Sequence, residues 1–220
     1  KFQKQNISNV RYINIEMSDV SKVKEKVKSH NLSGFNVTIP YKSKIIPFLD
    51  STENNSNLIG AVNTVKVIDG KLRGYNTDSI GFKQSILPFI KNRNNALILG
   101  SGGVSKAIKH VLEGLNINYR VVSRNSLFDY PDLLQEDIEN SEIIINTTPL
   151  GTFPNVNTYP DIPYKYISSK HLLFDVVYNP NISQFLNFGL LQGAKIINGL
   201  RMLEKQAEES WIIWNSDKIL

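Results

Sequence analysis

Cysteine is absent from the sequence, and histidine occurs only three times in 220 residues. The absence of cysteine excludes disulfide bonds, thiolate–zinc sites and a cysteine nucleophile. The three histidines, His30, His110 and His171, are scattered along the chain, so their spacing does not favour a metal site. We therefore expect no metal.

Long apolar runs are also lacking, as is a strong excess of one charge. No run reaches the roughly 18 apolar residues of a membrane span, and residues 1–8 lack the apolar core of a signal peptide. The formal net charge is +5, but basic residues are spread along the chain with acidic residues interspersed. This pattern favours a solvated surface over a nucleic-acid patch, and it is compatible with anionic small molecules. We expect a cytoplasmic protein, monomer or homodimer, that binds neither nucleic acid nor membranes.

The chain is long enough for one large domain or two small ones, and 41% hydrophobic residues suffice for a core. It begins with lysine rather than methionine, and its first residues read as the middle of a helix. We therefore expect that an N-terminal segment is missing from this sequence.

Residues 96–108 predict a buried strand, a glycine turn and the start of a helix. Four apolar residues precede Gly100, and apolar residues then recur at helical spacing. Gly100 suits a sharp turn, while Gly102 lets a pyrophosphate approach the backbone at the helix N-terminus. The spacing departs from Gly-x-Gly-x-x-Gly, because Gly103 follows directly and Ala107 takes the packing position. Alone, this pattern fits an ordinary tight turn as well as a nucleotide loop.

The first 95 residues predict helices and strands in mixed order. Asp19 or Ser18 can cap the first helix, and Pro40 ends a strand because it cannot continue a hydrogen-bonded ladder. Asp69 and Gly70 between two strand-like runs favour a hairpin. The expected elements are strand 11–17, a helix through Val20, Val23 and Val27, strand 34–39, helix 43–49, hairpin strands 59–68 and 71–76, and a helix from Asp78 to Leu87.

Beyond residue 95, strands and helices alternate, which is typical of a parallel, doubly wound sheet. The Pro- and Tyr-rich connection 149–169 fits either a ligand-facing edge or a mobile surface loop. The final helix is expected to pack back on the first half. The expected elements are strands 119–122, 142–146, 172–177 and 195–197, helices from about 130 and 182, and helix 200–215 with Met202, Leu203, Ala207, Trp211 and Trp214 facing the core.

Four polar residues of the first half stand out: Asn36, Lys42, Asn63 and Asp78. Each by itself could lie on an exposed face. Lys42 and Asp78, however, each follow the end of a predicted strand, where α/β folds place their chemistry. A lysine beside an aspartate is a pair that can transfer a proton.

The chain contains six recognisable segments: residues 34–42 (Gly-Phe-Asn-Val-Thr-Ile-Pro-Tyr-Lys), 60–64, 74–78, 100–103, 146–151 and 198–206. Together these segments resemble the shikimate dehydrogenase family. They occur in the family's order and cover essentially the whole chain. The resemblance implies an NADP-dependent enzyme of aromatic amino-acid biosynthesis that interconverts 3-dehydroshikimate and shikimate.

The implied fold class is α/β with two domains and an active site in the cleft between them. The substrate-binding domain would comprise residues 1–80 and 199–220. Residues 81–198 would form a Rossmann-like, doubly wound nucleotide domain. This division places the last helix on the first domain, because Gln206 must face Lys42 across one pocket if both touch the substrate.

The resemblance implies that Lys42 and Asp78 form the catalytic pair. A protonated lysine can neutralise a developing alkoxide and deliver the proton, while the aspartate orients the same hydroxyl. Hydrogen-bonding groups also suit a polyhydroxylated ring. The implied ligands of the substrate hydroxyls and carboxylate are Thr38, Asn63, Tyr178 and Gln206.

On the cofactor side, Arg124 follows the second strand of the nucleotide domain, where NAD enzymes usually carry an acid. A guanidinium there can pair with a 2′-phosphate, which favours NADP. The family pattern is Asn-Arg-Thr with a further basic residue, whereas this chain has Ser123, Asn125 and Phe128. The implied cofactor-binding residues are Gly100, Ser101, Gly102, Gly103, Val104, Ser123, Arg124, Asn125, Thr147 and Gly199.

One departure concerns the start of the chain. Family members carry Ser-x-Ser on an early loop that binds the substrate carboxylate, and no such motif precedes Asn36 here. We expect that the segment carrying it has been lost from this sequence. Two alternatives stay open: a quinate/shikimate dehydrogenase that uses NAD, and a degenerate, non-catalytic NADP-binding protein.

Overall fold

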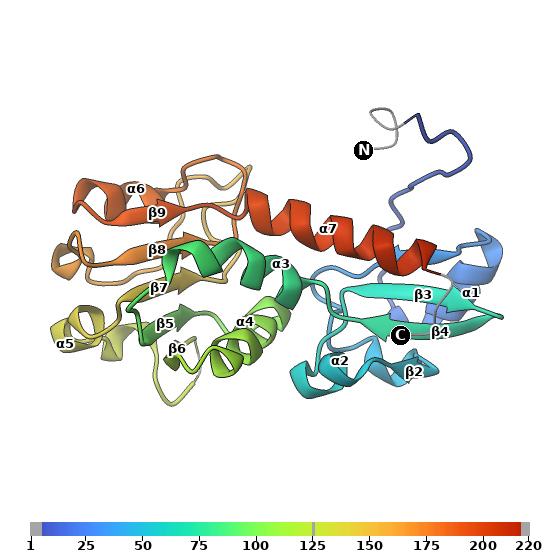
Figure 1. Ribbon diagram of the computed structural model, residues 1–220, viewed down its shortest axis with the longest axis horizontal. Helices are drawn as coiled ribbons and strands as arrows, with labels where there is room; N and C mark the ends of the chain where they lie inside the picture. The colour runs from blue at the N-terminus through green and yellow to red at the C-terminus, as the bar shows by residue number, and fades with distance from the viewer. Residues whose placement is uncertain (1–5, 125, 217–220) are drawn as a thin grey trace.

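The computed structural model describes residues 6–124 and 126–216. Two sheets lie side by side, each with its own helices (Figure 1). A four-stranded mixed sheet has the order β1-β3-β4-β2, and a five-stranded parallel sheet has the order β6-β5-β7-β8-β9. The predicted two-domain α/β class, with one doubly wound parallel sheet, is therefore confirmed.

The four-stranded sheet is centred on the hairpin that the sequence predicted. Asp69 and Gly70 have φ angles of 50° and 75°, and Ile68 pairs with Lys71 across the turn. A buried cluster that includes Val23, Val65 and Leu72 fills the space beneath the sheet. The elements here are 3-10 helix η2 (Val20–Lys22), α1 (Val23–Ser29), β1 (Gly34–Asn36), 3-10 helix η3 (Ile46–Phe48), β2 (Ser51–Thr52), α2 (Asn54–Ile59), β3 (Thr64–Ile68) and β4 (Lys71–Tyr75).

Two predictions for this half are wrong. The alternating residues 11–17 form no strand, because no neighbouring strand pairs with their backbone. The segment expected as helix 43–49 forms turns and only the short η3, since Pro47 has no N–H to donate to the preceding turn. Strand β1 is also shorter than predicted, and β3 begins at Thr64 rather than at residue 59, since Ile59 is the last residue of α2 and residues 60–63 lie outside any strand.

The five-stranded sheet has helices on both faces, and its strands agree with the predicted alternation. Apolar clusters fill both sides of the sheet, one around Ile98 and Phe174 and the other around Leu99 and Phe185. The helix expected from about residue 130 is divided into two short helices. The elements are β5 (Asn95–Leu99), α4 (Gly103–Gly114), β6 (Asn118–Val122), 3-10 helix η5 (Tyr130–Asp132), α5 (Gln135–Glu139), β7 (Ile143–Asn146), 3-10 helix η6 (Tyr164–Tyr166), β8 (Leu172–Asp175), α6 (Gln184–Leu191) and β9 (Lys195–Ile197).

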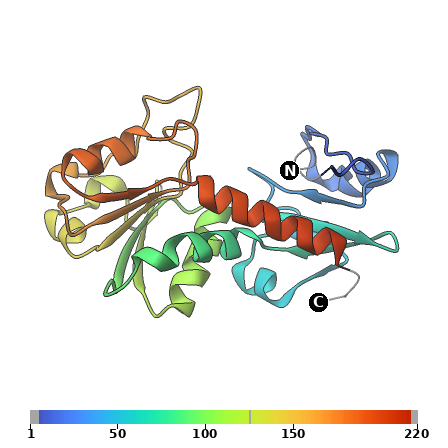
Figure 2. The same ribbon diagram turned by 45° about the horizontal axis from the view of Figure 1, so that its top comes forward.

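Two helices connect the sheets: α3 (Asp78–Ile86), followed by 3-10 helix η4 (Leu87–Phe89), and α7 (Leu200–Asn215). Figure 2 shows α7 running from the five-stranded sheet across to the hairpin strands. The two helices pack closely because Gly81 has no side chain: a Cβ there would lie 2.6 Å from the Met202 carbonyl oxygen. Met202 joins the core of the five-stranded sheet, whereas Trp214 Nε1 donates to the Val65 carbonyl oxygen of β3 at 2.9 Å. The exact domain bounds stay a prediction.

The expected core face of α7 needs one correction. Met202 is buried and Leu203, Trp211 and Trp214 are half-buried, but Ala207 is exposed. Ser210 and Ile213 are buried instead. This end of α7 faces polar side chains of the four-stranded sheet, among them Thr64. Ser210 is therefore buried there, although the spacing of apolar residues had placed Ala207 on the buried face.

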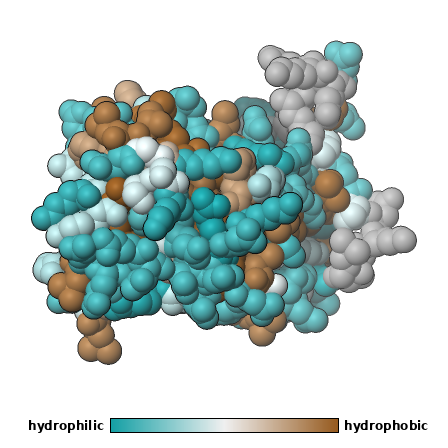
Figure 3. Space-filling model, turned by 60° about the vertical axis from the view of Figure 1, so that its left-hand side comes forward, coloured by the Kyte–Doolittle hydropathy of each residue, from teal (hydrophilic) through white to brown (hydrophobic). Residues whose placement is uncertain are grey.

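The face of the molecule that Figure 3 shows is mostly hydrophilic. Figure 3 shows the end of the molecule that the five-stranded sheet forms, where hydrophobic residues gather only in separate groups. Within residues 6–124 and 126–216, no helix is both long and apolar enough to cross a membrane. The same residues contain no group of three or more acidic and histidine side chains that could hold a metal ion.

Candidate active site

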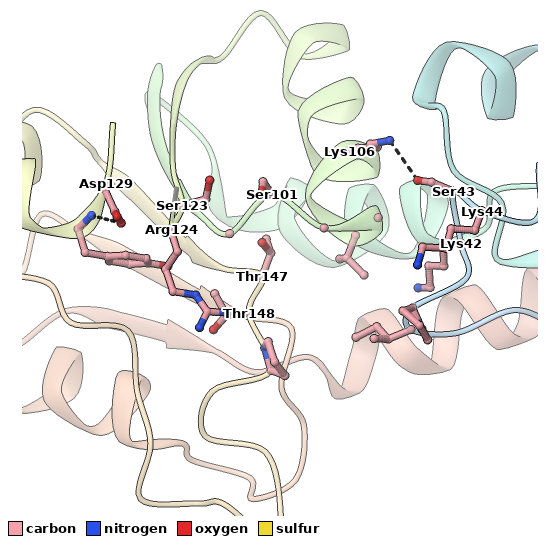
Figure 4. A pocket seen from close by; sticks show the side chains of 18 residues that line it. Lys42, Ser43, Lys44, Ser101, Lys106, Ser123, Arg124, Asp129, Thr147 and Thr148 are labelled. Atoms are coloured by element: carbon pink, nitrogen blue, oxygen red, sulfur yellow. Dashed lines mark hydrogen bonds between the residues drawn. The ribbon is translucent and has the colours of Figure 1, made fainter. Parts of the chain in front are cut away.

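Two adjoining cavities open between the sheets. The loop cavity, about 970 Å³, surrounds the glycine turn after β5 and the end of β6 (Figure 4). The junction cavity, about 560 Å³, lies between β1, β3, α3, α7 and the loops that follow β7 and β8. Both volumes lie in the range of small-molecule and cofactor sites. Lys42 and Val104 line both cavities, so the cavities meet at these residues.

Lys42 and Asp78 form a buried ion pair at this meeting point. Lys42 Nζ lies 2.6 Å from Asp78 Oδ2, and the two side chains are 13% and 7% exposed. The Lys42 backbone is held because its carbonyl oxygen accepts from Val62 N at 2.7 Å. Asp78 is the first residue of α3, where the helix dipole favours a carboxylate. The sequence predicted this pair, and the structure brings it together.

Asn63 holds the other oxygen of the Asp78 carboxylate. Its Nδ2 donates to Asp78 Oδ1 at 3.0 Å, and its Oδ1 accepts from the Thr77 backbone N at 2.7 Å. The Asp78 carboxylate is thus hydrogen-bonded on both oxygens and its orientation is determined. Asn63 is 3% exposed and lines the junction cavity.

The other three predicted substrate ligands also line the junction cavity. Gln206 of α7 accepts from Thr77 Oγ1 at 3.3 Å, and its Nε2 donates to the Leu203 carbonyl oxygen of its own helix. Thr38 follows β1 and Tyr178 follows β8, so they border the cavity from opposite sheets. Both side chains are exposed at the cavity surface.

The glycine turn has the shape that anion binding needs. Gly100 has a φ of +107°, and a Cβ there would lie 2.7 Å from Thr147 Oγ1. A Cβ on Gly102 would meet no atom within 4 Å, which means that its backbone borders open space. Helix α4 begins at Gly103 and directs its free N–H groups at this space. Ser101 and Val104 complete the predicted lining of the loop cavity.

Ser123 and Arg124 border the far end of the loop cavity, together with Asp129 and Tyr130. Burial raises the pKa of Tyr130, and the nearby charge of Arg124 opposes that shift. Asp129 is engaged as the cap of η5, since its carboxylate accepts from the Tyr130 backbone N at 2.7 Å. The predicted cofactor residue Asn125 lies outside the described residues.

The remaining two predicted cofactor residues lie in different places. Thr147 lines both cavities, and its Oγ1 donates to the Leu99 carbonyl oxygen at 2.7 Å. Gly199 lines the junction cavity and not the loop cavity. A Cβ on Gly199 would lie 2.1 Å from the Val176 carbonyl oxygen, so only glycine fits this close approach of α7 to the loop after β8.

A buried carboxylate that the sequence analysis did not single out supports both cavities. Asp175, at the end of β8, is fully buried and accepts from Asn146 Nδ2 and Val177 N, each at 3.0 Å. Ser183 Oγ contacts its second oxygen. Burial raises the pKa of Asp175 to about 7, although these hydrogen bonds act in the opposite direction. The cluster ties together the loops after β7 and β8, which line the junction cavity.

Sequence reasoning also missed a chain of buried hydroxyls beneath the site. Ser210 Oγ of α7 lies 2.8 Å from Thr64 Oγ1 and 3.2 Å from Thr77 Oγ1. Asn36 Nδ2 donates to Ser210 Oγ at 3.1 Å. The sequence analysis named Asn36 as a candidate because it is polar. It gave no reason to name Ser210, because a serine on a helix is expected at the surface unless its hydrogen-bond partners are known.

The fold and these cavities define a two-domain α/β protein of the dinucleotide-dependent dehydrogenase class. A glycine turn at a helix N-terminus faces one cavity, and a lysine–aspartate pair stands where the second cavity meets it.

Comparison with known proteins gives the family. The family model described as the shikimate dehydrogenase substrate binding domain matches residues 1–65. Over 96% of its length, the chain is 39% identical to a shikimate dehydrogenase (NADP(+)) of Methanococcus maripaludis, of which it covers 82%. This chain belongs to the shikimate dehydrogenase family.

Solved structures agree with this assignment. Shikimate dehydrogenase 1 from Peptoclostridium difficile superimposes with a TM-score of 0.84 at 35% identity, covering 100% of this chain and 85% of that one. The enzyme from Thermus thermophilus in complex with NADP(H) and shikimate has a TM-score of 0.80 at 26% identity, covering 91% of this chain and 79% of that one.

Proposed function

We propose that this chain catalyses the reversible, NADP-dependent reduction of 3-dehydroshikimate to shikimate, with Lys42 and Asp78 handling the proton. The observation that carries the proposal is the buried 2.6 Å pair at the meeting point of the two cavities. A ketone held in the junction cavity and a nicotinamide reaching in from the loop cavity would meet beside this pair.

Lys42 acts as the general acid in the reducing direction. As the carbonyl carbon accepts a hydride, negative charge develops on the carbonyl oxygen, and the Lys42 ammonium neutralises it and donates a proton. In the oxidising direction, the neutral amine accepts the hydroxyl proton. The side chain is 13% exposed, so the charge acts in a site from which most water is excluded.

Asp78 and Asn63 orient the reacting groups. Asp78 keeps Lys42 Nζ in place through Oδ2, while Asn63 Nδ2 on Oδ1 prevents the carboxylate from turning. Asp78 also accepts a hydrogen bond from the substrate hydroxyl when the product is shikimate. This preorganisation is useful because the donors need not move when charge develops.

Thr38, Asn63, Tyr178 and Gln206 bind the hydroxyls and carboxylate of the substrate. All four line the junction cavity with hydroxyl or amide groups. A cavity of this kind discriminates against analogues that lack a hydroxyl, because the protein groups would be left unpaired.

The residues around the loop cavity fit a dinucleotide. The open space at Gly102 and the N-terminus of α4 suit a pyrophosphate, and Arg124 suits a 2′-phosphate. When bound, NADPH supplies the hydride. Thr147, which lines both cavities, and Gly199, which lines the junction cavity, would border the nicotinamide end of the cofactor.

The proposal includes the division into a substrate domain, residues 1–80 with 199–220, and a nucleotide domain, residues 81–198. It also places the enzyme in the cytoplasm as a monomer or homodimer.

An absorbance assay of the reduced nicotinamide tests the proposal. The purified protein is incubated with shikimate and NADP, and then with quinate or NAD in place of either. We expect the highest kcat/KM with shikimate and NADP. A preference for quinate and NAD would establish the alternative dehydrogenase, and NADP binding without turnover on any pair would establish a non-catalytic protein.

A further inference from the structure

A cation of the nucleotide helix crosses to the opposite side of the cleft. Lys106, one turn into α4, donates from Nζ to Ser43 Oγ at 3.0 Å (Figure 4). The same Nζ donates to the Gly60 carbonyl oxygen at 3.2 Å. Ser43 Oγ itself donates to the same Gly60 oxygen at 3.0 Å. The three groups form a closed triangle, and two of its corners belong to the half that carries the four-stranded sheet.

Both segments that Lys106 contacts carry catalytic groups. Ser43 directly follows Lys42, and Gly60 begins the segment in which Val62 N donates to the Lys42 carbonyl oxygen. Asn63, the partner of the Asp78 carboxylate, is the next residue of that segment. A displacement of this triangle would therefore move the acid–base pair.

The contact surface around Lys106 is small and tightly packed. Ile59, Ala61 and Ala107 form a buried apolar cluster beside it, with Ala107 from α4 and the other two from the opposite half. At the start of the same helix, a Cβ on Gly103 would lie 2.9 Å from the Cβ of Lys42. Because α4 touches Lys42 directly, a small shift of the helix changes the position of Lys42.

We propose that Lys106 is a positioning residue, which holds α4 and its bound dinucleotide at the correct distance from Lys42 by bridging Ser43 and Gly60. The proposal rests on the proposed function. A charge-assisted hydrogen bond is about twice as strong as a neutral one, and the apolar cluster between α4 and residues 59–61 contains only two alanines and one isoleucine. A misplacement of about 1 Å can lower a rate by about a hundredfold.

The kinetic test replaces Lys106 by Met, which keeps the apolar stem and removes the donor. We expect kcat to fall by about ten- to a hundredfold, with the KM for NADP changed less than about twofold. Lys106→Arg should restore most of kcat, because a guanidinium can donate to both acceptors. Lys109→Met, on the same helix, is the matched control, since the Lys109 side chain makes no hydrogen bond or ion pair within residues 6–124 and 126–216.

A second test measures the geometry without activity. Because the chain has no cysteine, spin labels can be placed on Lys71→Cys and Glu136→Cys, one exposed position on each half. Pulsed electron resonance then reports the distance between the halves. Lys106→Met should shift or broaden this distance distribution, and Lys109→Met should leave it unchanged.

The outcomes separate this proposal from the proposed function. An unchanged distance distribution in Lys106→Met overturns the positioning role, whether or not the enzyme turns over. A raised KM for NADP with normal kcat also overturns it, since Lys106 would then be a phosphate ligand. Loss of turnover in the unmodified protein with every substrate would refute the proposed function alone, because the spin-label result would still decide the role of Lys106.

Discussion

The loop cavity and the junction cavity are built in opposite ways. One short stretch, from Gly100 to Val104, supplies much of the loop cavity, and its polar groups include the free backbone N–H groups at the start of α4. The junction cavity depends on side chains from separate elements. Asn63 and Gln206, for example, are 143 residues apart in the chain and within hydrogen-bonding distance in the fold.

This difference determines which substitutions each cavity tolerates. A backbone cradle tolerates many side-chain changes but no added Cβ at Gly100, where Thr147 Oγ1 would lie 2.7 Å away. The buried part of the junction cavity tolerates little change of side-chain chemistry, because Asn63 donates hydrogen bonds to both Asp78 and Gln206. Removal of one member leaves a buried partner unpaired, which costs about 1–3 kcal/mol for a neutral group.

The largest expected effect tests the junction cavity. Lys42→Ala should lower kcat by about a hundredfold to ten-thousandfold, the range of general acid–base catalysis, and substrate binding should suffer less. Lys28→Ala, an exposed lysine on α1, is the control. Steady-state kinetics with shikimate and NADP measures both.

The companion variant Asp78→Asn tests whether Lys42 or Asp78 transfers the proton. If Lys42→Ala raises only the KM for shikimate, proton transfer belongs to Asp78. Near-normal kcat in both variants would remove the dehydrogenase mechanism proposed for this site.

The next effect tests the loop cavity through a side chain rather than its backbone. Arg124→Ala should raise the KM for NADP by about ten- to a hundredfold and the KM for NAD much less, because charge-assisted bonds contribute about 1.5–3 kcal/mol. Arg11→Ala, on the exposed N-terminal segment, is the control. Equal losses with both cofactors would show that Arg124 is structural.

A third prediction concerns the buried carboxylate that supports the loops lining the junction cavity. The pKa of Asp175 rises from 3.8 to about 7 in the folded protein, so the folded state keeps a proton that the unfolded state releases between these values. This group should therefore lower the free energy of unfolding by about 1.4 kcal/mol per pH unit as the pH rises through that window.

Asp175→Asn removes this dependence while it preserves the shape of the side chain. Chemical denaturation at a series of pH values should give a flatter profile for the variant than for the natural sequence. Asp161→Asn, an exposed carboxylate, is the control and should leave the slope unchanged. Parallel profiles for Asp175→Asn and the natural sequence would contradict the buried, proton-retaining carboxyl.

The smallest effect tests the corrected face of α7. Ala207 is exposed, so Ala207→Gln should change the free energy of unfolding by less than about 0.5 kcal/mol. Thermal or chemical denaturation measures the change. A loss above about 1 kcal/mol would mean that Ala207 does face the core, as its apolar spacing suggested.

Local signals in the sequence were sufficient for several elements. The glycine turn between β5 and α4 and the hairpin at Asp69 and Gly70 formed as predicted, because each depends on backbone conformations that neighbouring residues specify. The alternation after residue 95 likewise predicted the parallel sheet. The Lys42–Asp78 pair was also anticipated, since both residues follow strand ends in recognisable segments.

Other features depended on partners that the sequence does not display. Residues 11–17 had the alternation of a strand, but a strand also needs a neighbour to accept its hydrogen bonds. Helical spacing assigned Ala207 to the core, whereas the buried position belongs to Ser210, whose hydroxyl meets that of Thr64, 146 residues earlier in the chain. Pattern reasoning ranks residues by polarity, and a buried serine is visible only when its partner is known.

The sequence by itself determined the class of each half and the residue types of the Lys42–Asp78 pair, because strands, turns and residue types are local properties. The distance between α4 and Lys42 was decided only by tertiary structure. It depends on Lys106 reaching Ser43, 63 residues earlier, and on Gly103 leaving no atom between the helix and Lys42. Contacts between residues so far apart in the chain depend on how the whole chain packs. The residues near Lys106 in the sequence do not determine which carbonyl oxygen its ammonium group contacts.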